Sequence, residues 1–121
     1  MNRLLAFLAL SLITSSSALF AQGVDSERLA AVLDAQAAET KARYGYRHPQ
    51  ETLEFFEVAP GTVVVEALPG SGWYTKILSP YVGPEGSVVG VDYAQQMFPL
   101  FGFFSEEQLK AKETWAQDWV A

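Results

Sequence analysis

The hydrophobic positions between residues 62 and 92 change their spacing twice along the chain. A continuous β-branched run gives way to apolar residues that recur every four positions, and a second continuous apolar run follows. Continuous runs are typical of strands buried on both faces, whereas a spacing of four is typical of a helix. The pattern predicts, in order, a strand over Thr62–Val65, a helix over Trp73–Tyr81 and a strand over Val88–Val91.

Two glycines and two acidic residues complete this unit. Gly70 and Gly72 precede the predicted helix, and Glu66 and Asp92 close the two predicted strands. Glycine lets the backbone approach a ligand closely, and the first N–H groups of the following helix point at the same place. Asp92 would lie where its carboxylate can accept hydrogen bonds from ribose hydroxyls. The segment therefore predicts a Rossmann-like α/β fold that binds a nucleoside-containing cofactor.

Two residues indicate which cofactor this is. A dinucleotide-binding loop has a third glycine at the position that Thr75 occupies here. Glu66 lies before the glycines, where a carboxylate is unfavourable near a pyrophosphate but suits a cationic group. S-adenosylmethionine has an ammonium and a sulfonium, so the residues favour it. A nucleotide-dependent oxidoreductase is the less favoured alternative.

The run V-V-E-A-L-P-G-S-G-W-Y-T, followed by V-V-G-V-D, resembles motifs I and II of class I S-adenosylmethionine-dependent methyltransferases. The resemblance extends from Arg47 to the end of the chain. Over this range the sequence is similar in particular to exported bacterial proteins described as "predicted methyltransferase". It implies a larger Rossmann-like parallel sheet, of which only the first two strands and their flanking helices are present. By this resemblance the chain is the N-terminal part of a methyltransferase and is expected to be inactive alone. The sequence does not identify the methyl acceptor, and a small-molecule substrate is expected.

The resemblance also implies roles for individual residues. The implied cofactor-binding residues are Glu66, Gly70, Ser71, Gly72, Asp92 and Tyr93. The glycine loop would face the methionine part of the cofactor, and Glu66 would hold its amino group. Asp92 would hold the ribose, with Tyr93 on the adenine side. Many members of the family have glycine where this chain has Leu68, so the loop can differ here. A non-catalytic exported module that keeps the nucleoside loop is the alternative function.

The start of the chain has the pattern of an export signal. A short positive segment with Arg3 precedes the apolar run Leu4–Ile13, and small residues follow at Ala18 and Ala21. We expect cleavage after Ala21, or else after Ala18, with an uncleaved membrane anchor as the alternative. The expected organisation is a signal peptide over 1–21, a helical cover over 22–59 and the methyltransferase part over 60–121. The mature protein would be periplasmic or secreted and would contact the membrane only through this signal.

Composition narrows the chemistry further. The formal net charge is −6, which argues against nonspecific binding to nucleic acids. The chain has no cysteine, so a thiol nucleophile and a cysteine metal site are excluded, and no metal site is predicted. His48 is the only histidine. It is a weak candidate for a general base, and a structural role beside the following helix is the simpler interpretation.

The remaining segments predict helices around this unit. They are one long helix over Asp25–Arg43, one over Gln50–Glu57 with Leu53 and Phe56 facing inward, one beginning at Tyr93–Phe98, and a last one carrying Trp115 and Trp119. Asp25 or Ser26 would cap the first helix, and Ser105–Gln108 is a capping box for the last. The charges of the last helix are interpreted as a solvated face.

Overall fold

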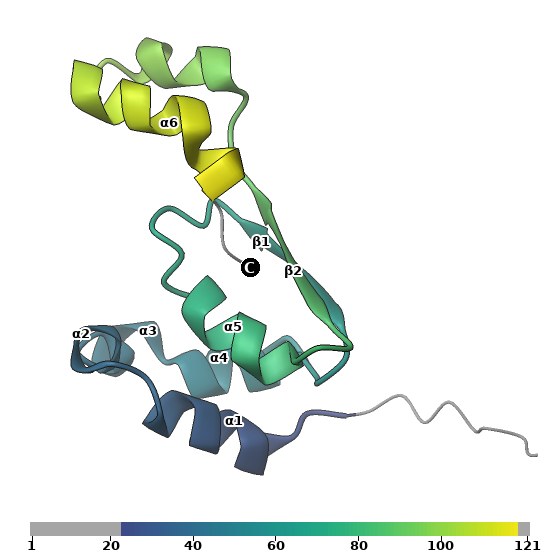
Figure 1. The fold of residues 1–121 in the computed structure, drawn as a ribbon. Helices are drawn as coiled ribbons and strands as arrows, with labels where there is room; N and C mark the ends of the chain where they lie inside the picture. The colour runs from purple at the N-terminus through teal and green to yellow at the C-terminus, as the bar shows by residue number, and fades with distance from the viewer. Residues whose placement is uncertain (1–22, 119–121) are drawn as a thin grey trace, which may run out of the picture.

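The computed structural model describes residues 23–118, with side chains as far as Ala116. The predicted signal peptide and Trp119 lie outside these residues. In chain order the elements are α1 (Ser26–Asp34), α2 (Ala38–Lys41), α3 (Tyr44–Arg47), α4 (Pro49–Phe55), β1 (Val63–Ala67), α5 (Thr75–Val82), β2 (Ser87–Val91), the 3₁₀ helix η1 (Gln95–Phe101) and α6 (Glu106–Asp118). Figure 1 shows α1, α4 and α5 grouped beside the strands, while η1 and α6 lie beyond the strands' carboxyl ends.

The two strands form a parallel pair, and α5 makes the connection between them. The register places Val64 opposite Val88 and Glu66 opposite Gly90. Gly86 precedes β2 where no larger residue fits, since an added Cβ would lie 2.6 Å from the Thr62 carbonyl oxygen. The predicted α/β class and the order of strand, helix and strand are confirmed. The strand predicted to end at Val65 extends to Ala67, because Leu68 N–H still donates to the Val91 carbonyl at 2.7 Å.

The core lies between α5, α1 and α4. Ile77 and Tyr81 of α5 are fully buried against Leu29 of α1, and Leu53 of α4 joins the same cluster. The buried Tyr81 hydroxyl donates to the Val58 carbonyl at 3.0 Å and accepts from the Asp25 N–H at 3.1 Å. Both polar roles of this hydroxyl are therefore satisfied inside an apolar cluster. The spacing of four predicted for α5 is confirmed as its buried face.

The other face of the sheet corrects one expectation. Val63 and Val65 remain 68% and 64% exposed, and Val89 and Val91 of β2 point to the same uncovered face. α5 packs on the face that carries Val64 and Val88, whereas the four valines of the other face remain 46% to 68% exposed. The prediction of strands buried on both faces is wrong for residues 23–118. The continuous β-branched run Thr62–Val65 nevertheless indicates correctly that β1 carries apolar side chains on both faces.

The outer edge of β1 is also open. The Ser87 N–H donates to the Thr62 carbonyl, and the Leu68 N–H donates to Val91. Because alternate residues of a parallel strand bond to opposite sides, the N–H and C=O groups of Val63, Val65 and Ala67 point away from β2. A groove of about 660 Å³, the edge groove, runs along this side between β1, α4 and α5.

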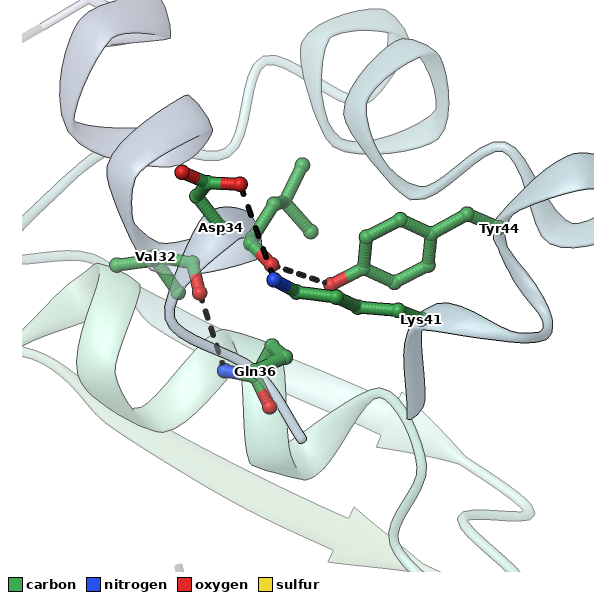
Figure 2. A network of polar contacts seen from close by, with 6 residues as sticks. Val32, Asp34, Gln36, Lys41 and Tyr44 are labelled. Carbon is green, nitrogen blue, oxygen red and sulfur yellow. Dashed lines mark hydrogen bonds and ion pairs between the residues drawn. The ribbon is translucent and has the colours of Figure 1, made fainter. Parts of the chain in front are cut away.

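The N-terminal helices are shorter than predicted. α1 ends at Asp34 and α2 begins at Ala38, so the expected helix over residues 25–43 is broken. In Figure 2 the Tyr44 hydroxyl donates to the Leu33 carbonyl at 2.8 Å, and Lys41 reaches back to Asp34, 3.8 Å away. These contacts fold the following residues back onto the end of α1. A short helix, α3, occupies the segment between the helices predicted over residues 25–43 and 50–57.

Gln36, which lies in the break between α1 and α2, donates a hydrogen bond to α5. Pro80 has no N–H, so the Lys76 carbonyl in α5 lacks its usual helical partner. The Gln36 side-chain amide donates to that carbonyl at 3.0 Å and to its own Val32 carbonyl at 3.3 Å, the second contact being visible in Figure 2. The Arg28 guanidinium likewise donates to the Pro80 carbonyl at 3.1 Å. Arg28 of α1 and Gln36, which follows α1, thus supply donors to two carbonyls of α5.

Of the predictions for Phe56, for the helix after Tyr93 and for the cap of the last helix, only the last is fully confirmed. Phe56 was expected to face inward, but it is exposed beyond the end of α4, where it stacks edge-on with Phe55. The helix expected to begin at Tyr93 is the 3₁₀ helix η1, which starts at Gln95. The capping box is confirmed, since the Gln108 N–H donates to the Ser105 hydroxyl and the Ser105 N–H to the Gln108 side chain.

Candidate cofactor site

The carboxyl ends of β1 and β2 meet at one cavity of about 300 Å³. Leu68 and Gly70 line it from the loop after β1, and Asp92 and Tyr93 line it from the segment after β2. The remaining walls come from η1, the residues after it and α6: Phe98, Phe101, Phe103, Phe104 and Lys112. We call this the crevice cavity. The structure therefore brings three of the predicted site residues, Gly70, Asp92 and Tyr93, to one place.

The loop between β1 and α5 turns through three residues with positive φ. Gly70 and Gly72 have φ values of 58° and 70°, which glycine adopts without strain. Leu68 has φ 55°, where a side chain is unfavourable, and it occupies the position at which glycine is common in the resembling family. Ser71 lies between the two glycines in the same loop. The chain therefore has positive φ at Leu68 as well as at the two glycines of the loop.

Glu66 lies inside β1 and does not line the crevice cavity; it lines the edge groove. Its Oε2 accepts a hydrogen bond of 2.6 Å from the Thr75 hydroxyl at the start of α5. Burial raises the pKa of the Glu66 carboxyl above its ordinary value, and hydrogen bonds from the Thr75 hydroxyl and N–H oppose that rise. The carboxylate is therefore also an acceptor for the first residue of α5, a role that sequence reasoning missed.

Asp92 is held by the chain itself. Its Oδ1 accepts from the Tyr93 N–H at 2.8 Å, and its Oδ2 accepts from Lys112 Nζ of α6 at 3.0 Å. The Asp92 side chain is only 6% exposed, and that of Lys112 is 21% exposed. Lys112 also lies above the Phe98 ring, 4.6 Å from its centre. The prediction that the charges of the last helix form only a solvated face is wrong for Lys112.

The aromatic residues after Tyr93 form the wall between the cavity and α6. Phe98 is buried, and its ring contacts those of Tyr93, Phe101 and Phe104 edge-on. The aromatic residues between Phe98 and Phe104 therefore pack mainly on one another, and Phe98 also packs on Lys112. Phe103 remains exposed at the rim of the cavity.

Comparison with known families supplies the activity. The family model described as protein-L-isoaspartate (D-aspartate) O-methyltransferase (PCMT) matches residues 46–113, more than half of the chain. The chain belongs to this methyltransferase family. PCMT methyltransferases use S-adenosylmethionine as methyl donor, so the predicted cofactor is confirmed. Comparison with curated proteins and with solved structures gave no match.

The residues of this PCMT-family chain fit the adenosine end of S-adenosylmethionine. The crevice cavity offers a carboxylate for hydroxyl groups, aromatic rings for a flat base and a glycine loop with open space, since a Cβ on Gly70 would touch nothing within 4 Å. Glu66 offers a second carboxylate next to the same loop. Asp92 fits only if the ribose shares or replaces its contact with Lys112.

His48 lies apart from the crevice cavity of the PCMT-family fold. It lines a different cavity of about 470 Å³ among the N-terminal helices, and its Nδ1 is 3.5 Å from Glu51 Oε1. Its backbone has φ 43° immediately before Pro49, and its side chain makes no cap hydrogen bond to α4. The geometry gives no support to His48 as a general base or as a side-chain cap.

Between residues 23 and 118, no helix has the length and apolar character needed to cross a membrane. Within the same residues, no group of three histidine or acidic side chains is arranged to hold a metal ion.

Proposed function

We propose that the crevice cavity binds the adenosine part of S-adenosylmethionine in this methyltransferase, with the glycine loop against the methionine part. In this proposal Asp92 accepts the ribose hydroxyls, and Tyr93 borders the adenine. Glu66 receives the ammonium from the side of the loop that faces β1. The observation that carries the proposal is that Gly70, Asp92 and Tyr93, which follow two different strands, line one cavity.

Bound S-adenosylmethionine supplies an electrophilic methyl group on a sulfonium. The chain's contribution is to orient that group, for which well-aligned reactants gain about 7–11 kcal/mol over free encounter. Gly70 and Gly72 allow the backbone to come close, and the two carboxylates fix the two ends of the cofactor. The methyl group leaves the sulfonium as a neutral thioether remains; a carboxylate acceptor needs no proton transfer, whereas a hydroxyl or amine acceptor loses its proton.

The acceptor and the location of the protein extend the proposal. The PCMT family is named for transfer to L-isoaspartyl and D-aspartyl groups of proteins, so an isoaspartyl peptide is the first acceptor to test beside small molecules. We also propose export with cleavage after Ala21, on the pattern of residues 1–21. N-terminal sequencing of a periplasmic or secreted product should then begin at Gln22.

A titration with two ligands tests the cofactor site. We expect S-adenosylmethionine to bind the purified protein more tightly than NAD, because Thr75 replaces the third glycine of a dinucleotide loop. Asp92→Ala should lower that affinity by about one to two orders of magnitude, since hydrogen bonds to a charged group contribute about 1.5–3 kcal/mol.

Ser71→Ala is the matched control, because this loop position contributes mainly backbone. Its affinity should equal that of the parent protein. An Asp92→Ala variant that remains folded and binds as tightly as the parent would remove the ribose assignment. Preferential binding of NAD would instead favour an oxidoreductase-type site in the same crevice.

A further inference from the structure

Thr75 is a buried polar residue between the two parts of the proposed cofactor site. It is the first residue of α5 and is 3% exposed. Its hydroxyl donates to Glu66 Oε2 at 2.6 Å, a short hydrogen bond of the kind formed with an ionised acceptor. This bond fixes one of the two oxygens of the Glu66 carboxylate.

The same side chain lies beside the glycine loop. A Cβ built on Gly72 would lie 3.2 Å from Thr75 Oγ1 and 3.5 Å from Thr75 Cβ, so a side chain at position 72 would crowd Thr75. The Gly72 carbonyl in turn accepts from the Lys76 N–H at 3.1 Å, which ties the loop to the first turn of α5. Thr75 therefore contacts both the loop and the acid.

The sheet leaves space beside this carboxylate. Glu66 is paired with Gly90 of β2, and directly paired residues of a parallel sheet carry their side chains on the same face. Because Gly90 has no side chain, no neighbour from β2 covers Glu66 at this position. A ligand group can approach the carboxylate oxygen that does not bond to the Thr75 hydroxyl.

We infer that Thr75 is a positioning residue for the amino-acid end of the cofactor. It orients the Glu66 carboxylate that receives the ammonium, and its side chain lies beside Gly72 of the loop that borders the methionine part. Thr75 itself does not contact the cofactor. This inference rests on the proposed function, specifically on the role of Glu66.

A pair of ligands separates positioning from general stability. S-adenosylmethionine has the ammonium, whereas 5′-methylthioadenosine has the same adenosine and no amino-acid part. Thr75→Val keeps the shape of the side chain and removes the hydroxyl. We expect it to weaken S-adenosylmethionine binding about tenfold while leaving 5′-methylthioadenosine binding within about twofold of the parent. A variant that weakens both ligands equally, or neither, would overturn the inference.

Two further variants keep the test decisive if Thr75→Val does not fold. Thr75→Ser retains the hydroxyl. It should preserve the ratio of the affinity for S-adenosylmethionine to the affinity for 5′-methylthioadenosine found in the parent; a selective loss of S-adenosylmethionine binding would overturn the inference. Glu66→Gln should lower the same ratio, and adding Thr75→Val to it should have no further effect. If the parent protein binds neither ligand, the proposed function itself fails, which is a different result from an unchanged ratio.

Discussion

A substitution of Lys112 tests whether the cofactor displaces the ion pair between Lys112 and Asp92. Its Nζ lies 3.0 Å from Asp92 Oδ2, at the carboxylate that the proposed ribose contact requires. Lys112→Met removes the charge and keeps an unbranched side chain over Phe98. If the cofactor has to displace Lys112, this variant should bind S-adenosylmethionine more tightly than the parent, because the competing contact no longer exists.

The magnitude follows from the burial of the pair. With side chains 6% and 21% exposed, solvent screens this contact less than an ordinary surface ion pair. A hydrogen bond to a charged group contributes about 1.5–3 kcal/mol, which corresponds to a gain in affinity of about 10- to 150-fold if the whole contact is lost on binding. The same substitution should lower the thermal midpoint of the free protein, since α6 loses its ion pair with Asp92.

Isothermal titration calorimetry and thermal unfolding measure these two effects. Lys110→Met is the control, because Lys110 is exposed on the same helix and should change neither quantity. Tighter binding together with a lower midpoint is the expected signature. Equal affinity in Lys112→Met and the parent would refute the reasoning, since Asp92 would then keep Lys112 in the complex or would not bind the ribose.

Two other predictions concern the loop and its acid. Leu68→Gly should be more stable than Leu68→Ala by about 1 kcal/mol in urea unfolding, because only glycine relieves the strain at φ 55°; equal stabilities would show that the strain is absent. Since the pKa of Glu66 is raised by folding, its ionisation weakens the folded state as pH rises above the ordinary carboxyl pKa. Glu66→Gln should therefore gain stability relative to the parent as the pH rises above the ordinary carboxyl pKa, and a stability difference that does not change with pH would contradict this.

The sequence predicted the elements that depend on local spacing and local caps. The spacing of Trp73, Ile77 and Tyr81 predicts the buried face of α5, because residues four apart share one side of a helix. The Asp25 carboxylate accepts from the Arg28 N–H at 2.9 Å, as an N-cap does, and this also needs only local sequence. The position of Asp92 after β2 follows from the strand pattern in the same way.

The features that sequence reasoning missed depend on contacts between distant residues. Lys112 lies 20 positions beyond Asp92, and no periodicity relates a helix lysine to an acid at a strand end. The break between α1 and α2 is stabilised by Tyr44 and Lys41, whose partners become evident only once the helices are folded together. The exposure of Val63 and Val65 depends on which elements pack on that face of the sheet. The sequence of an apolar strand does not determine which element that is.

The hydrogen bonds from α1 and its flanking residues to α5 affect how the protein unfolds. Gln36 and Arg28 supply donors to the Lys76 and Pro80 carbonyls, and the Asp25 N–H supplies one to Tyr81. If α1 detached, α5 would lose these donors at the turn that Pro80 already weakens, and Ile77 and Tyr81 would lose their apolar contact with Leu29 and become exposed to water. Local opening of α1 is therefore costly without loss of α5. Amide hydrogens of α1 and α5 should consequently exchange with solvent as one cooperative unit, with similar protection in both helices.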